Sequence, residues 1–276
     1  MRDLSADDQT VLLDELAAGL LDPDGDLDEV LAIESHLTGT LRADLAPRLE
    51  AHLATAVNAG NWYARAVLAG LLAETAGRSS LPVLLRAWSR DLGDDQDGLT
   101  TMITILAQDD PAAARRTLLP WTECTDADLR RAALWLLGFV PDPADVAVLA
   151  QAAHDPDERI RSVVAGTLGS HDGADPAAVD LMVRLLADPS EQVRISALDS
   201  LGYRRRPRTL PDICRLADDA SARVRAWVAI ALQRFPATET GDGPTAEVLA
   251  RLERDPDPHV RDQAMTARQR AAHRGR

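Results

Sequence analysis

The sequence DPDERIR at 155–161 is the clearest copy of a segment that recurs along the chain. Further copies are DPSEQVR at 188–194, DASARVR at 219–225 and DPDPHVR at 255–261; a shorter copy, DADLR, stands at 126–130, and weaker copies, NWYAR and QDGLT, stand at 61–65 and 96–100. Their last residues fall at positions 65, 100, 130, 161, 194, 225 and 261, with spacings of 35, 30, 31, 33, 31 and 36. Self-similarity at a period of about 20–50 residues indicates a repeat protein.

Each copy predicts the start of a helix. Four residues before the repeated position stand Asn61, Gln96, Asp126, Asp157, Ser190, Ser221 and Asp257. All except Gln96 are strong N-cap residues, whose side chains accept hydrogen bonds from the free amides of a first helical turn. The residues before each cap also have a helical pattern, as in 144–153 and 177–187, and Asp-Pro ends that earlier helix. Each unit is therefore a hairpin of a helix A and a helix B, and such hairpins must stack to bury their apolar stripes.

The pattern Asp-Pro…Val-Arg…Ala…Leu-Gly resembles the HEAT-repeat family, including the short bacterial HEAT-like repeats of bilin lyase-type proteins, over about 40–271. The resemblance implies an all-α fold: a right-handed α-solenoid of about seven HEAT-like helical hairpins, in one continuous domain over 41–276. Residues 1–40 differ, and we expect an N-terminal helical cap there. In this cap Ser5 begins a helix that ends at Leu21, and a second helix runs from Leu27 to about Leu37.

The same resemblance implies a ladder of side-chain bonds between the turn Asp and the helix-B Arg of neighbouring repeats. The matching acids are Asp94, Asp155, Asp188, Asp219 and Asp255, and the matching bases are Arg65, Arg130, Arg161, Arg194, Arg225 and Arg261. Cys124 and Thr100 depart from the pattern, so the ladder should be broken around the second and third units. An exposed pair would contribute only about 0–1 kcal/mol. The alternative interpretation is that the arginine stripe is a phosphate-binding track.

Charge is distributed unevenly along the chain. The net charge is −14, and residues 1–110 hold 20 Asp or Glu against 7 Arg, a balance of −13. Such an acidic front half repels nucleic acid and anionic membranes and attracts a basic protein partner. No apolar run is long enough to span a membrane, and the acidic start is unlike a secretory signal. Cys124 and Cys214 lack metal-ligand spacing, which is typical of reduced packing thiols in a cytoplasmic protein.

Catalytic motifs are missing from the sequence. The six histidines form no HExxH motif and no Cys/His cluster, and the chain has no GxGxxG, Walker A or GxSxG segment. Deoxyhypusine hydroxylase, a HEAT-like enzyme, binds iron through His-Glu pairs, and no His-Glu dipeptide occurs here. Alternating aspartates at 22–28 resemble a calcium loop only in part, since Pro23 intrudes and Ile33 replaces the last ligand. We therefore expect no enzyme, no cofactor and no metal.

A partner surface is predicted on the B helices, which line the concave face of a HEAT solenoid. At about 100° per residue, positions two and six residues after the apolar residue that precedes each Arg point away from the core. Those positions include Ile105, Arg131, Trp135, Ile195 and Ile230, where a solvated face should be polar. Trp135 with Arg131 is typical of an interface anchor. The alternative is that tight curvature buries these residues against neighbouring B helices.

Other conspicuous side chains have more ordinary interpretations. Trp62 and Tyr63 are weaker partner-binding candidates, and Trp88, Trp121 and Trp227 are assigned to packing. The basic run at 204–208 is either a solvated loop or a contact for an anionic group.

Three function classes follow from these patterns. The first is a scaffold, adaptor or inhibitor that holds a protein partner on the concave surface, and the acidic front half predicts that this partner is basic. The second is a HEAT-like enzyme or an accessory to cofactor attachment, by resemblance to bilin lyases. The third is a nucleic-acid-binding repeat protein, which the charge disfavours. The sequence favours the first class.

Overall fold

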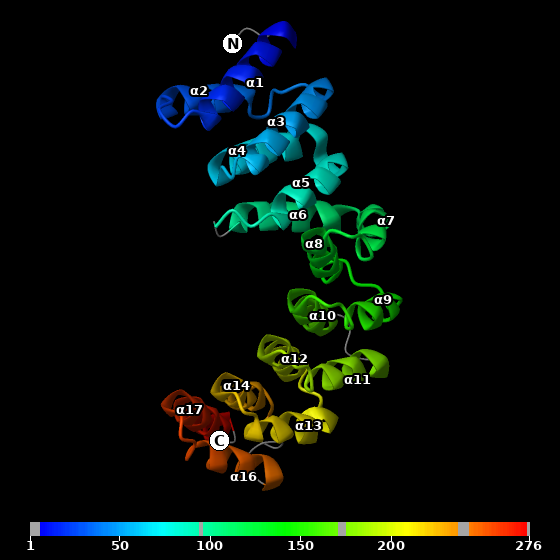
Figure 1. The fold of residues 1–276 in the computed structure, drawn as a ribbon, viewed down its shortest axis with the longest axis vertical. Helices are drawn as coiled ribbons and strands as arrows, with labels where there is room; N and C mark the ends of the chain where they lie inside the picture. Colours follow the sequence, from blue (N-terminus) through cyan, green and yellow to red (C-terminus); the bar gives the residue numbers. More distant parts are fainter. Residues whose placement is uncertain (1–5, 94–95, 171–174, 237–242, 275–276) are drawn as a thin grey trace. The chain divides into compact units, whose positions relative to one another are not determined.

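The computed structural model describes residues 6–93, 96–170, 175–236 and 243–274. Throughout these ranges the chain is built of helices and turns, without a β-strand (Figure 1). It divides into two compact units, unit 1 (Met1–Val140) and unit 2 (Pro141–Arg276).

Unit 1 begins with the two helices predicted for the N-terminal cap and continues with three hairpins. The cap helices are α1 (Ala6–Leu21) and α2 (Leu27–Leu37), and the hairpins are α3 (Ala46–Asn58) with α4 (Trp62–Ala76), α5 (Leu81–Ser89) with α6 (Asp97–Asp109), and α7 (Pro111–Trp121) with α8 (Ala127–Leu137). Short 3-10 turns, η1 (Ala43–Leu45) and η2 (Gly77–Ser80), precede α3 and α5. Ser5, the expected cap of the first helix, lies outside the described residues.

Unit 2 contains four further hairpins. They are α9 (Asp145–Ala152) with α10 (Glu158–Ser170), α11 (Pro176–Leu185) with α12 (Glu191–Arg204), α13 (Leu210–Arg215) with α14 (Ala222–Gln233), and α16 (Gly243–Leu252) with α17 (Pro258–Arg274). The 3-10 turns η3 (Pro207–Thr209) and η4 (Leu216–Asp218) flank α13. The helical hairpins expected from the repeats are thus present, and the prediction of an all-α solenoid is confirmed.

The repeated cap positions start most of the B helices as expected. Asn61 accepts a hydrogen bond from the amide of Ala64, and Asp126 accepts from the amides of Asp128 and Leu129. Two positions differ from this pattern. Ser190 is the N-cap residue of α12, as predicted, but its side chain makes no cap bond, and Gln96 has left-handed backbone with φ 54°. A long amide side chain cannot fold back onto its own first turn as Asn or Asp can.

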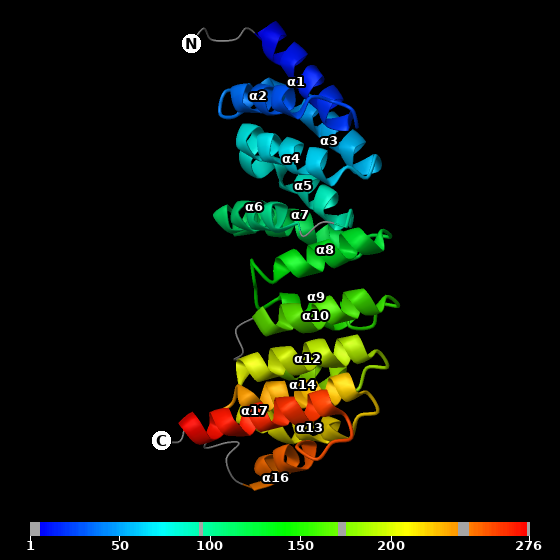
Figure 2. The ribbon, with the colours of Figure 1, turned by 90° about the vertical axis from the view of Figure 1, so that its left-hand side faces the viewer.

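Small residues let the B helices of unit 2 approach one another closely. Figures 1 and 2 show α10, α12, α14 and α17 side by side. A Cβ on Gly202 of α12 would lie 2.9 Å from Cα of Ala231 in α14. The buried hydroxyl of Ser200 donates to the carbonyl of Ala165 at 2.8 Å, which ties α12 to α10. In the central helices α12 and α14, about half of the residues are therefore buried.

None of the described helices combines the length and the apolar character needed to cross a bilayer.

Candidate functional site

The repeated arginines of unit 2 are held by carboxylates of the following hairpin. Arg161 donates from Nε and Nη2 to the two carboxylate oxygens of Asp188, at 2.8 and 2.9 Å. Its Nη1 donates to the backbone carbonyl of Asp155, six residues earlier, at 2.9 Å. One guanidinium thus joins the turn of its own repeat to the turn of the next.

The same arrangement recurs at the next two steps. Arg194 donates to Asp219 at 2.9 Å, and Arg225 donates to both oxygens of Asp255 at 2.8 and 2.9 Å. The paired side chains are only 7–15% exposed. These pairs are therefore mostly buried, whereas the sequence interpretation treated them as exposed. Because carboxylates already occupy these guanidinium groups, the geometry gives no support to a phosphate track.

The repeat arginines of unit 1, where Cys124 and Thr100 depart from the repeat pattern, donate to backbone carbonyls. Arg130 still donates to the backbone carbonyl of residue 124 at 2.8 Å, a contact that needs no Asp side chain. Arg65 is buried and donates to the carbonyl of Arg90 at 3.0 Å. Asp94, the matching acid, lies outside the described residues.

At the Arg position that Thr100 occupies, a different bond forms. The indole Nε1 of Trp88, on α5, donates to Oγ1 of Thr100, on α6, at 2.8 Å. This bond fixes the indole ring, whose face is then available for stacking. Thr100, at a position that is Arg in most of the repeats, thus positions an aromatic side chain.

Trp88 and Trp135 form the centre of an aromatic cluster, which we define as Trp88, Arg131, Trp135 and Phe139. The two indoles are stacked, with centroids 4.4 Å apart and planes 18° apart. Phe139 packs on Trp135 at 4.8 Å, tilted by 56°. The guanidinium carbon of Arg131 lies 5.8 Å from the Trp88 ring centroid, within the range of a cation–π contact.

This aromatic cluster reaches the surface of unit 1. Phe139 is 39% exposed, and Trp135, Trp88 and Arg131 are half-buried. Trp135 is therefore neither free in solvent nor enclosed between helices. Trp135 packs against the core of unit 1, and part of its side chain remains exposed for contact.

The other predicted surface residues divide into exposed and buried ones. Ile105 on α6 is 60% exposed, as a partner contact must be. Ile230 on α14 is half-buried. Ile195 on α12 is only 4% exposed, so its assignment to a partner surface is wrong. The close approach of the B helices in unit 2 buries a position that an isolated helix would expose.

Sequence reasoning missed two members of the aromatic cluster. Trp88 was assigned to packing, and it does pack, but it also forms the platform on which Trp135 stacks. Phe139 follows Trp135 by four residues, and that spacing alone places the two on one side of a helical turn. The contact between Trp88 and Trp135 joins residues 47 positions apart, and no local pattern reports it.

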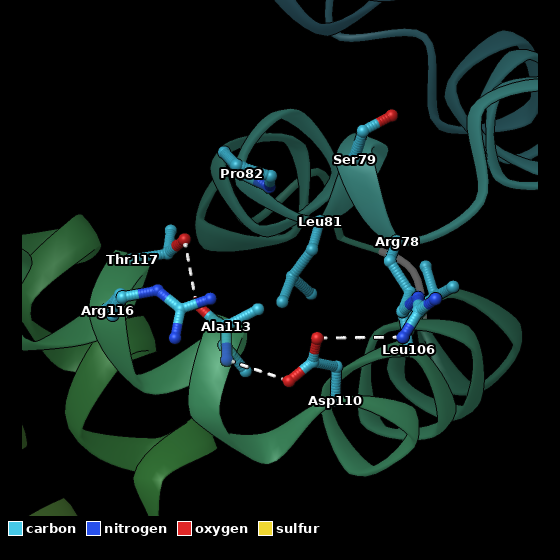
Figure 3. A pocket seen from close by; sticks show the side chains of 10 residues that line it. Arg78, Ser79, Leu81, Pro82, Leu106, Asp110, Ala113, Arg116 and Thr117 are labelled. Carbon is cyan, nitrogen blue, oxygen red and sulfur yellow. Dashed lines mark hydrogen bonds and ion pairs between the residues drawn. The ribbon is translucent and has the colours of Figure 1, made fainter.

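A pocket of about 380 Å³ lies elsewhere in unit 1, between η2, α5, α6 and α7 (Figure 3). Leu81 lines its wall, and Arg78 forms an ion pair with Asp110 across it at 3.5 Å. Asp110 also caps α7 through the amide of Ala113, and Thr117 donates to the Ala113 carbonyl. The polar groups around this pocket thus hold helix ends together.

The placement of the His, Cys, Asp and Glu side chains in the described part of the chain shows what metal-binding and thiol chemistry is available there. No group of three or more His, Cys, Asp or Glu side chains there could hold a metal ion. Both cysteines are free, and burial raises the pKa of the Cys214 thiol, which keeps it protonated near neutral pH.

Comparison with known families agrees with this geometry. The family model for HEAT repeats matches residues 92–169, 115–190 and 179–267, which together span more than half of the chain. The chain belongs to the HEAT-repeat family. Family membership accounts for the helical hairpins and for their stacking.

Solved structures place this HEAT-repeat chain in the same fold. The crystal structure of YibA from Escherichia coli is 18% identical over 98% of this chain and 99% of that one, with a TM-score of 0.52. A Kap121p mutant is 17% identical over 97% of this chain, with a TM-score of 0.63, and this chain spans only 34% of its length. Human deoxyhypusine hydroxylase, at 20% identity over 82% of this chain and 96% of that one, has a TM-score of only 0.38. No curated protein sequence matches the chain.

Proposed function

We propose that this HEAT-repeat chain is a cytoplasmic protein-binding scaffold, acting as an adaptor or an inhibitor, and that it holds a basic protein partner on the concave, B-helix face of unit 1. The observation that carries the proposal is the surface-reaching aromatic cluster, in which a stacked tryptophan pair lies beside an arginine.

The composition of the aromatic cluster suits an interface anchor. Trp, Tyr and Arg are enriched among the residues that dominate binding energy, and aromatic side chains give large contact areas at low entropic cost. The stack with Trp88 and the packing of Phe139 already hold the Trp135 ring in place. Little rotamer freedom is therefore left to lose when a partner covers the exposed edge.

The charge of the front half supports a basic partner. Residues 1–110 carry −13 of the −14 net charge. Asp22, Asp24, Asp26, Asp28 and Glu29 are all exposed at the turn between α1 and α2. An acidic surface raises the association rate of a basic protein, and the effect is screened beyond about 8 Å at physiological salt.

Affinity purification followed by mass spectrometry tests the proposal. Wild-type protein and the Val11→Ala variant should both recover the same basic protein, because Val11 is an exposed apolar residue on α1, outside the B helices, at 54%. A variant with Ile105→Ala and Phe139→Ala should lose it, because Ile105 is an exposed residue of the predicted B-helix surface and Phe139 is the most exposed member of the aromatic cluster. These two positions are cleaner probes than Trp135, whose half-buried ring also packs the core. If the variant with Ile105→Ala and Phe139→Ala also recovered the basic protein, that result would contradict the proposed surface.

Kinetic measurements with the recovered partner complete the test. Trp135→Ala should weaken binding by about 2 kcal/mol or more, as expected of an interface hot spot. Raising the salt concentration should slow association far more than it accelerates dissociation, because steering acts before contact. An acidic partner, or an association rate that salt does not change, would refute the charge argument.

A further inference from the structure

A second surface feature lies in unit 2, where α12 and α14 end beside each other. Gly202, Tyr203, Arg205 and Arg234 line a pocket of about 290 Å³ there. Gly202 is packed against Ala231, and this close approach brings the two helix ends together. The guanidinium carbon of Arg234 lies 5.7 Å from the Tyr203 ring centroid, and Tyr203 is 73% exposed.

The neighbourhood of this pocket is strongly basic in an otherwise acidic chain. It contains Arg204, Arg205, Arg206, Arg208 and Arg234. Only two of them form ion pairs with described residues: Arg208 with Asp180 at 3.3 Å, and Arg234 with Asp199 at 2.6 Å. Each helix end contributes only about half a negative charge. The two helix ends are therefore too weak to neutralise the three remaining guanidinium groups.

Backbone conformation adds a second observation at Arg205. This residue caps the end of α12 with φ 49° and ψ 47°, in the left-handed region that glycine adopts most easily. The cap itself needs only the backbone amide, which donates to the carbonyl of Leu201 at 3.0 Å. Glycine would make the same cap at lower conformational cost. The Arg205 side chain is therefore not needed for the helix cap, and its guanidinium adds a positive charge to the pocket.

Arg234 is held in place by its neighbours. Its Nη1 donates to both the backbone carbonyl and a carboxylate oxygen of Asp199, at 2.8 and 2.6 Å. The side chain is thus oriented before any ligand arrives, with its other N–H groups still able to donate. A fixed arginine beside a second arginine is the arrangement that recognises oxyanions, because the planar guanidinium matches phosphate and carboxylate oxygens.

We propose that this pocket binds the phosphate monoester group of a phosphorylated ligand. A phosphate monoester carries a charge of about −1.5 to −2 at neutral pH. Its charge therefore matches that of two arginines better than the single charge of a carboxylate does. Tyr203, which lines the pocket, carries a hydroxyl that can donate a further hydrogen bond. The small volume fits the phosphate group with a short substituent.

Titration of phenyl phosphate, followed by nuclear magnetic resonance, tests the proposal, with benzoate as the carboxylate probe and diethyl phosphate as the diester probe. Saturable binding of phenyl phosphate is expected, with affinity at least about tenfold above that of either other probe. Equal binding of benzoate or diethyl phosphate, or no saturation by phenyl phosphate, would overturn the assignment.

Arg205→Gly separates binding from folding. The melting temperature should rise, because glycine relieves the left-handed strain, while phenyl phosphate affinity should fall by at least about tenfold. Arg205→Asn, which also tolerates this conformation, provides a second variant with the same expected loss. Arg223→Gln, at the opposite end of α14, removes the same charge and should bind phenyl phosphate as the wild type does. Retained affinity in both Arg205 variants would refute the site.

Discussion

Arg161 of the fourth hairpin and Asp188 of the fifth form a two-pronged ion pair, in which Nε lies 2.8 Å from Oδ2 and Nη2 lies 2.9 Å from Oδ1. The same carboxylate accepts a hydrogen bond from the amide of Ser190 at 2.9 Å and so shapes the turn that precedes α12. The pair therefore joins two repeats and organises the second turn. Its burial makes each such link matter more for stability than a surface ion pair would.

Removing one ladder arginine should destabilise unit 2 strongly. Arg194→Ala leaves the Asp219 carboxylate, whose side chain is 12% exposed, without its guanidinium partner. We expect a loss of about 3 kcal/mol in the free energy of unfolding, the lower end of the range for breaking a buried ion pair. Urea denaturation measures the loss. Arg223→Ala is the matched control, because its ion pair with Glu191 is 63% and 40% exposed and should contribute less than about 1 kcal/mol. Equal losses would contradict the role of burial.

The ladder should also make stability depend on acid pH. Burial of the Asp188 carboxyl raises its pKa, but hydrogen bonds from Arg161 and the Ser190 amide outweigh burial, so the pKa lies below its ordinary value of 3.8. The folded state thus binds this proton less readily than the unfolded state does. The stabilisation is complete above pH 3.8 and is lost as the pH falls from there through the folded pKa.

Comparing a ladder variant with the wild type isolates this effect. In Arg161→Ala the pKa of Asp188 should return to its ordinary value or rise above it. The substitution removes the guanidinium that lowers this pKa, whereas the burial that raises it remains. The unfolding free energy of the variant should therefore decline less steeply as the pH falls below about 3.8. Chemical denaturation at several pH values measures both slopes. Identical slopes would mean that Asp188 does not contribute to acid sensitivity.

Local sequence patterns were sufficient to predict the repeats but not to predict which residues are exposed on the surface. The cap position at Asp126 and the spacing of Arg161 and Arg194 depend on contacts within a hairpin or between adjacent hairpins, which recur with the repeat. Exposure depends instead on how closely two helices approach. Ile195 was assigned to an open face because a helical wheel treats each helix as isolated, whereas it is 4% exposed. Gly202 was the available signal, since glycine within a helix often marks a close helix contact.

Positioning of the aromatic cluster should depend on one threonine. In Thr100→Val the indole Nε1 of Trp88 loses its acceptor while the side-chain shape is kept. We expect a loss of about 1 kcal/mol in the free energy of unfolding, together with a shift in tryptophan fluorescence, because a half-buried donor is left unpaired. Thr101→Val is the control, since Thr101 is exposed and bonds only within its own helix, to the Asp97 carbonyl. If the two variants had the same free energy of unfolding and the same tryptophan fluorescence, the indole bond would not fix the cluster.

Two glycine-to-alanine substitutions should have effects of opposite sign. In Gly202→Ala the new methyl group would lie 2.9 Å from the Cα of Ala231, a backbone atom that cannot move aside without shifting α14. Forcing extra volume between packed helices should lower the free energy of unfolding by about 1–3 kcal/mol. Gly166→Ala places the same methyl group on the exposed side of α10, where no atom lies within 4 Å. There the gain in helix propensity should raise stability by about 0.5–1 kcal/mol. Thermal denaturation of the two variants measures both signs, and stabilisation by Gly202→Ala would show that α12 and α14 are not in close contact.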